Sequence, residues 1–198
     1  MTKTRKLLAS LLVVGAVGAI AAFGVFSAFT STTQNPGNNI TAGDVTIGDN
    51  DAGSALYAVT NGKPGSTVTK CITITYTGSL DADVKLYTSD SIGALGQYVD
   101  LTIQPGNFPD PSNPPASMAC TGFSADGSAI FNNTLANFAS THDSYDDGLV
   151  DFPGSTTKWA DNNIVAYQIT ATLQSGASNS AQNATTNSHA FTWEARNQ

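Results

Sequence analysis

Few side chains in this sequence have the types and spacing that catalysis requires. The two histidines, His142 and His189, do not form the H-E-x-x-H spacing that places two zinc ligands on one helix. The only glutamate, Glu194, follows Trp193 in an alternating segment, where a solvent-exposed strand position is expected. The serine-hydrolase turn G-x-S-x-G and the phosphate-binding P-loop are both missing from the sequence. We therefore expect no catalytic site, no cofactor-binding site and no enzyme activity.

Two clusters of aspartates contain the residue types of calcium sites. Asp49 and Asp51 stand in G-D-N-D-A-G, which matches the first half of a calcium loop but lacks the glutamate at its twelfth position. The second cluster lies in H-D-S-Y-D-D-G-L-V-D and consists of Asp143, Asp146, Asp147 and Asp151. Aspartate is also a common turn residue. Both interpretations stay open, and calcium is the only cofactor that these residues suggest.

The two cysteines, Cys71 and Cys120, indicate a disulfide. An even cysteine count in an exported chain favours a bridge, which would here close a loop of about fifty residues and contribute roughly 4 kcal/mol. Cys71 alternates away from the apolar face of its segment, so the bridge would hold the proline-rich stretch 105–117 across the outer side of a sheet. Two separate free thiols are the alternative.

The N-terminal residues 1–27 have the architecture of a secretory signal peptide. Three basic residues precede an uncharged run from Leu7 to Phe26, and small residues follow. We expect export to the extracellular matrix or cell surface, with cleavage between Ser27 and Ala28. A retained transmembrane helix is the alternative, because such a run is long enough to cross a bilayer. Glycines within the run and the lack of charge after it favour removal.

The charge of the remaining chain excludes one class of partner. The sequence has 8 basic and 15 acidic residues, and three of the basic residues lie in the signal peptide. Its removal leaves a net charge of about −10, without a basic patch that could attract phosphates. We expect no binding to nucleic acid and no membrane association after cleavage.

The exported part shows period-2 alternation typical of β-strands with one apolar face. The clearest example is S-T-V-T-K-C-I-T-I-T-Y-T-G, which places Val68, Ile72, Ile74 and Tyr76 on one face and threonines with Cys71 on the other. Further strands are predicted at 43–47, 55–60, 82–88, 98–104, 128–131, 164–173 and 189–195. About eight short strands of this kind predict an all-β, antiparallel β-sandwich.

The segments between these strands are rich in Gly, Pro, Asn and Asp, as turns require. The stretch 105–117 is expected to run over the surface, because proline cannot pair inside a sheet. The only helix predicted is a short one within 132–140, where Leu135 and Phe138 are three residues apart.

The segment that follows the signal peptide is uncharged and contains one large apolar residue, Phe29. It is compatible with a β-strand but has too few apolar side chains to hold itself against a sheet. Joined to the domain by the flexible N-P-G-N-N, it could fold back onto its own sheet or add to the open sheet edge of a neighbouring copy. The second arrangement is a head-to-tail contact, which yields a filament when its rotation does not close.

Several segments occur in an order that resembles a known family. After the uncharged run come A-A-F-G-V-F-S-A-F-T-S-T, N-N-I-T-A-G-D-V-T-I, a K-P-G turn with the alternating strand that ends in T-G-S-L, and a terminal F-T-W-E-A. Their order and spacing resemble the TasA/camelysin (CalY) family of secreted proteins. The resemblance covers the first ninety residues and, loosely, the last strands, while 105–160 is particular to this chain.

The resemblance implies a jelly-roll-like sandwich that polymerises with itself into fibres of a biofilm matrix or surface pili. It also implies export with a SipW-type signal peptidase. The chain would then divide into a signal peptide (1–27), a donor-strand segment (28–40) and a sandwich domain (41–198). The donor strand, which completes the sheet of the next subunit, would begin with Ala28, Phe29, Thr30, Ser31, Thr32 and Thr33.

Two other functions remain open at this point. A monomeric surface module could bind glycans or proteins through Thr/Asn-rich faces and the aromatics Tyr145, Trp159 and Tyr167. Camelysin-type members carry a metallopeptidase label, which these residues do not support because they offer no plausible metal-ligand set.

Overall fold

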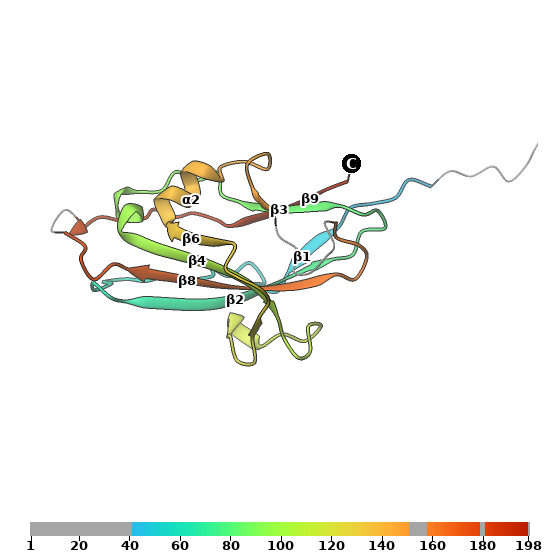
Figure 1. Ribbon diagram of the computed structural model, residues 1–198, viewed down its shortest axis with the longest axis horizontal. Coiled ribbons are helices and arrows are strands. Elements are labelled where there is room, and N and C mark those ends of the chain that lie inside the picture. Colours follow the sequence, from blue (N-terminus) through green and yellow to red (C-terminus); the bar gives the residue numbers. More distant parts are fainter. Residues whose placement is uncertain (1–40, 151–157, 179–180, 198) are drawn as a thin grey trace, which may run out of the picture. The chain divides into compact units, whose positions relative to one another are not determined.

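The computed structural model describes residues 41–150, 158–178 and 181–197. Contacts within the chain place a boundary between Thr41 and Ala42. In the described part of the second unit, the chain forms an antiparallel β-sandwich with one α-helix, and its two sheets form separate layers (Figure 1). The all-β fold class predicted from alternation is confirmed. Jelly-roll connectivity stays a prediction.

The larger sheet has the order β1-β2-β8-β4, and β4 carries β5 and β6 along its outer edge. All of its pairings are antiparallel, and β2 and β8 pair over nearly their whole length. Its strands are β1 (Ile47–Asp49), β2 (Thr67–Tyr76), β4 (Val99–Asn107), β5 (Ser124–Ala125), β6 (Phe131–Thr134) and β8 (Ile164–Leu173).

The smaller sheet has the order β7-β3-β9, so β3 is central and β9 forms one edge. Its strands are β3 (Asp83–Tyr87), β7 (Leu149–Val150) and β9 (Thr192–Arg196). The short helix α2 (Leu135–Thr141) begins at Thr134, whose side-chain oxygen accepts a hydrogen bond from the Asn137 N–H at 3.2 Å. The described chain also contains the 3₁₀ segments η1 (Ala94–Tyr98) and η2 (Ala116–Met118).

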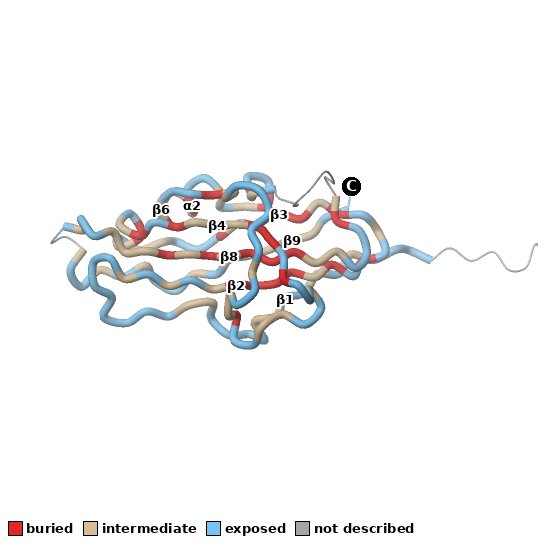
Figure 2. Tube along the Cα trace, turned by 60° about the horizontal axis from the view of Figure 1, so that its bottom comes forward, coloured by how far each residue is buried: buried red, intermediate tan, exposed pale blue. Residues whose placement is uncertain are grey.

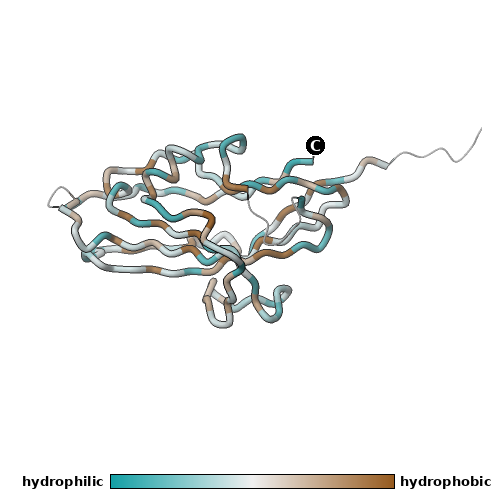
Figure 3. The backbone as a smooth tube through the Cα atoms, viewed as in Figure 1, coloured by the Kyte–Doolittle hydropathy of each residue, from teal (hydrophilic) through white to brown (hydrophobic). Residues whose placement is uncertain are grey.

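The hydrophobic core lies between the two layers. Buried residues run along β2, β8, β4 and β3 (Figure 2), and hydrophobic residues concentrate on the strands (Figure 3). The apolar face predicted for the segment around Cys71 is confirmed, because Ile72, Ile74 and Tyr76 are at most 3% exposed. Leu135 and Phe138 of α2 are fully buried, and α2 contacts β4 and β6.

The disulfide Cys71–Cys120 is present and lies on the outer face of the larger sheet. The two Cα atoms are 5.1 Å apart, and Phe108 and Phe123 pack with the bridge in a small second cluster. Figure 1 shows the loop between β4 and β6 on the side of the sheet opposite α2 and β9. The predicted position of the bridge, across the outer side of the sheet, is therefore confirmed.

Five predictions about strands are wrong, one of which is the strand predicted at 189–195, which covers Thr192–Arg196. The first strand covers 47–49 instead of 43–47, and the strand predicted at 128–131 begins at Phe131. Residues 55–60 form no strand. Strand β4 continues through Pro105, which was expected to begin a surface loop. Pro105 is tolerated because its carbonyl, and hence its nitrogen, faces away from β8: the carbonyl accepts a hydrogen bond from the Asp126 N–H at 2.9 Å.

Candidate functional site

Among the described residues, the sandwich is open along one side, where one strand of each sheet has an edge without a partner strand. In the larger sheet, β1 covers only the end of β2, pairing with Ile74–Tyr76. The rest of β2 has no strand beside it on that edge within the described chain. In the smaller sheet, β9 pairs with β3 and has no strand on its other side among the described residues.

The hydrogen-bonding groups of this β2 edge can be assigned from the alternation of the ladder. The Thr77 N–H donates to the Thr46 carbonyl at 2.9 Å, and the Thr73 N–H donates to the Asn50 side chain at 2.8 Å. Odd-numbered residues of β2 therefore direct their main-chain groups to the open edge. Thr67, Thr69 and Cys71 present theirs there without a strand partner in the described chain, which is the arrangement that accepts an added strand.

A groove of about 1490 Å³ lies between the two sheets at this open side. Its floor is the inner face of β2 and β8, including Val68, Ile72 and Leu173. Its roof is the segment 181–191 together with Trp193 of β9. The volume exceeds that of typical small-molecule pockets, about 300–1,000 Å³. The groove is thus large enough to hold part of an extended peptide.

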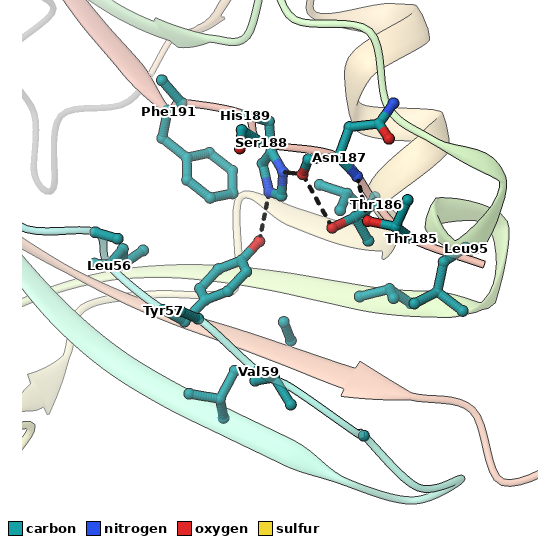
Figure 4. Close-up of a pocket in the computed structure, with 18 of the residues that line it drawn as sticks. Leu56, Tyr57, Val59, Leu95, Thr185, Thr186, Asn187, Ser188, His189 and Phe191 are labelled. Carbon is teal, nitrogen blue, oxygen red and sulfur yellow. Dashed lines mark hydrogen bonds between the residues drawn. The ribbon is translucent and has the colours of Figure 1, made fainter. Parts of the chain in front are cut away.

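One segment of the chain, residues 54–62, lines the groove, and we call it the strap (Figure 4). It contains the apolar residues Leu56 and Tyr57, which pack against the core, and Val59, which is 57% exposed. Within the described chain, no main-chain hydrogen bond joins residues 55–62 to β2 or β9. The strap therefore lies at the open side of the sandwich without pairing as a strand.

The strap is held to the roof by a hydrogen bond from Tyr57 to His189. The Tyr57 Oη lies 2.8 Å from His189 Nε2, and His189 Nδ1 lies 3.1 Å from the Asn187 carbonyl (Figure 4). Because that carbonyl can only accept, Nδ1 carries the proton and Nε2 accepts from the tyrosine. Burial raises the pKa of Tyr57, so its hydroxyl stays protonated and donates. The Tyr57 ring also meets Phe191 edge-on.

No family model matches the chain, and no curated protein matches it.

A second cluster fixes the point at which the described chain enters the domain. The Asp44 carboxylate accepts a hydrogen bond from the Ser79 hydroxyl at 2.7 Å and one from the Thr46 hydroxyl at 3.1 Å. The Asp44 N–H donates to Ser79 Oγ at 2.9 Å, and the Leu80 N–H donates to the Asp44 carbonyl at 3.2 Å. The hydrogen bonds with Ser79, mainly, hold the pKa of Asp44 below its ordinary value. The sequence motifs A-G-D-V and T-G-S-L thus contact each other.

The predicted calcium residues form local turn contacts. The Asp49 carboxylate accepts from the Asp51 N–H at 3.0 Å, and Asp51 accepts from the Gly53 N–H at 2.6 Å. Desolvation by burial raises the pKa of Asp49. In the region of Asp143, Asp146 and Asp147, the main-chain carbonyls of the last two bind Lys85 and His142. Among the described residues, no three metal-ligating side chains converge. Calcium binding stays a prediction.

The residues considered for catalysis or ligand binding lie in structural positions. His142 Nδ1 contacts the Asp147 carbonyl at 2.6 Å, and the ring packs on Phe138. Glu194 pairs with Arg196 at 2.6 Å and accepts from Tyr87 at 2.8 Å, and these contacts lower its pKa. The three aromatics proposed for a binding surface are at most 6% exposed, so they offer no surface for a ligand: Tyr145, Trp159 and Tyr167.

Two other predicted sites lie outside the described residues. These are the cleavage site Ser27–Ala28 and the donor strand from Ala28 to Thr33. In the described part of the chain, none of the helices is long and apolar enough to cross a membrane. The disulfide is of the kind that persists in oxidising compartments.

The sequence did not reveal the groove or its roof. Residues 181–190 are polar and carry no periodic pattern, so nothing marked them as one wall of a site. The alternation at 55–60 predicts a strand that does not form. The turn-forming residues on both sides of this segment are the signal that argues against a strand. Left-handed residues do flank this segment, at Ala52 and Asn61.

Proposed function

We propose that this protein is a secreted structural subunit that polymerises head to tail into extracellular fibres. The N-terminal segment 28–40 of one copy adds as a strand to the open side of the sandwich of the next copy. The observation that carries this proposal is the groove between two strand edges, on β2 and β9, that have no partner strand in the described part of the chain. An incoming strand gains main-chain hydrogen bonds from the edge and buries apolar side chains in the groove.

The size and lining of the groove support a peptide as its occupant. Its floor residues Val68 and Leu173 and its roof residues Phe191 and Trp193 are only partly buried, although they pack against the core. Each would lose further solvent contact against an added strand, which is favourable by about 25 cal/mol per Å² of apolar surface. Polar residues of 181–190 line the rest of the roof and suit the threonine-rich segment 28–40.

The position of the chain entry favours a neighbouring copy over self-complementation. The Asp44–Ser79 contacts lie at the end of β2 that follows Tyr76, whereas the open edge runs back to Thr67. These ends are about 30 Å apart, at 3.3 Å per residue. The chain's own segment would have to reverse direction and pass β1 to reach its groove. A segment from another copy enters at the far end without such a reversal.

Electron microscopy of the chain that begins at Ala28 tests the proposal. We expect filaments of one-subunit width at high protein concentration, and none from a variant that lacks residues 28–38. Circular dichroism must show that this variant keeps its β-structure. A matched control replaces the same residues by a Gly/Ser linker of equal length, which keeps the chain length but removes Phe29 and the β-branched threonines. A deletion variant that still polymerises would overturn the proposal.

The groove also supports a second candidate, a monomeric module that binds a glycan or a peptide of another protein. The observation in its favour is the polar roof, with Asn, Ser and Thr side chains beside the Tyr57 ring. This candidate predicts ligand binding that survives deletion of residues 28–38 and is lost when Tyr57 is changed to Ala. Dispersed monomers in microscopy, with such binding, would place it first.

A further inference from the structure

We infer that the strap, residues 54–62, is a placeholder that lies along the β2 edge of the dispersed subunit and moves away when a strand from a second copy is added to that edge. The inference rests on the proposed function and concerns the regulation of the same site. The strap belongs to the segment that joins the end of β1, beside Ile74, to the start of β2 at Thr67, so it runs back along the edge at which an added strand would pair. Its residues line the groove there (Figure 4).

The first argument is that the strap has the sequence of a strand without the bonds of one. Its residues S-A-L-Y-A-V-T alternate, and Leu56 and Tyr57 pack against the core. Within the described chain, however, the main-chain groups of 55–62 bind neither sheet edge. Moving the strap out therefore breaks no ladder hydrogen bonds, whereas the incoming strand forms several with Thr67, Thr69 and Cys71.

The second argument is that the strap is bounded by hinge-like positions at both ends. Ala52 and Gly53 have φ values of 52° and 75° before it, and Asn61 and Gly65 have φ values of 54° and 84° at its end. Non-glycine residues are uncommon in this left-handed region, which is favoured mainly by glycine and, less strongly, by asparagine. A segment between two such turns can move as a unit by changing a few dihedral angles.

The third argument is that few contacts hold the strap in place, and one polar contact is dominant. The Tyr57 hydroxyl donates to His189 at 2.8 Å, and the Tyr57 ring meets Phe191. In contrast, Val59 is 57% exposed and Ala58 and Thr60 are exposed. Tyr57 is thus the latch of the strap, and its release opens the β2 edge.

Limited proteolysis with chymotrypsin, which cuts after large apolar residues, tests this inference. The chain from Ala28 is kept dispersed at low concentration, and cleavage after Leu56 and Tyr57 is followed by mass spectrometry. A synthetic peptide of residues 28–40 is then added, with a scrambled peptide as control. We expect the 28–40 peptide to raise cleavage in the strap several-fold and to leave cleavage elsewhere unchanged.

A matched pair of variants tests the latch. Tyr57→Phe removes only the hydroxyl that contacts His189, whereas Tyr87→Phe removes a hydroxyl that contacts Glu194, also at 2.8 Å, outside the groove. Tyr57→Phe should raise cleavage after Leu56 and the rate of filament growth about two- to tenfold, as the loss of one hydrogen bond allows. Tyr87→Phe should change neither.

The outcomes separate this inference from the proposed function. Binding is measured independently by the fluorescence anisotropy of a labelled 28–40 peptide. Binding without increased strap cleavage would overturn the placeholder and leave the fibre proposal intact. If the peptide does not bind and the chain forms no filaments, both proposals fail. Equal effects of the two tyrosine variants would remove Tyr57 as the latch.

Discussion

The two halves of the sandwich differ in how the inner face of the larger sheet is covered. Over β4 and β6, helix α2 places Leu135 and Phe138 on the sheet, and both are fully buried. At the first half of β2, the open side of the sandwich is lined by the strap, whose Val59 is 57% exposed. The helix satisfies its main-chain groups internally, whereas the strap leaves its own groups and those of the β2 edge without ladder partners in the described chain.

This difference separates stability from binding capacity. The half under α2 buries large side chains completely and stabilises the fold. The half under the strap keeps apolar residues partly accessible, which is typical of interaction sites. The halves are connected by a row of aromatic rings, in which Tyr57 meets Phe191, and Phe191 lies 5.7 Å from Phe138 between ring centroids. The side chains that line the groove therefore pack, through Phe191, against the core beneath α2.

The largest effect is expected in the closed half. Changing Phe138 to Ala should lower the free energy of unfolding by about 3–5 kcal/mol, because it leaves a cavity beneath α2. Urea unfolding measures this loss. Phe123→Ala, in the small outer cluster, is the control and should cost less, because Phe123 is only partly buried. A loss at Phe123 equal to that at Phe138 would contradict the contrast between a central core and its satellites.

The disulfide should have the next largest effect. Reducing Cys71–Cys120 should lower the melting temperature, with a loss of roughly 2–4 kcal/mol, because the bridge restricts the unfolded chain. Differential scanning calorimetry with and without reductant measures it. The variant with both cysteines changed to Ala serves as control and should not respond to reductant. If the wild type melts at the same temperature with and without reductant, and its thiols react with an alkylating agent before reduction, the bridge is absent in solution.

The contacts of Asp44 should produce a smaller, pH-dependent effect. Hydrogen bonds mainly with Ser79 lower the pKa of Asp44 from its ordinary value of 3.8. The stabilisation is therefore present above that value and is lost as the pH falls through the lowered pKa. Asp44→Asn should melt below the wild type at neutral pH, and the gap should close in acid. The exposed Asp126, changed to Asn, is the control. A gap that is independent of pH would contradict this account.

The smallest effect is expected in the strap. Val59→Ala should change the free energy of unfolding by no more than about 0.5 kcal/mol, as for an exposed surface residue. The matched variant Val84→Ala removes the same atoms from a side chain that is 3% exposed on β3 and should cost about 1–3 kcal/mol. Denaturant titration compares the two. Equal losses would show that the strap belongs to the stable core.

Much of the fold could be predicted from the local alternation of apolar and polar residues, whereas the groove could not. Strands β2 and β8 were predicted well because each alternates over ten residues, with apolar side chains on one face. The same alternation at 55–60 predicted a strand that is absent, since a strand also needs a partner edge and its bonds. Pro105 was misplaced because its tolerance depends on which way its nitrogen faces. Such facts depend on distant neighbours, which a local pattern does not contain.

The candidate site was predictable only in its parts. The disulfide and its position followed from cysteine count and strand alternation. The roles of Asp44 and Ser79 were visible only as separate motifs, because 35 residues separate them in the sequence. The aromatics Tyr145, Trp159 and Tyr167 were misassigned to a surface, since burial is not encoded in residue type alone.

The Asp44–Ser79 contacts also determine how the domain would respond to mechanical force. A pull on the chain before residue 42 is transmitted first to Asp44 and then to β1, which lies antiparallel along β2. Tension along the strand axis loads the hydrogen bonds of β1 and β2 together, in shear, instead of opening them one at a time. Strand β2 is in turn tied by Cys71 to the loop on the outer face. Tension at the chain entry is thus transmitted to β2, which pairs with β8 along its length and is held by the disulfide.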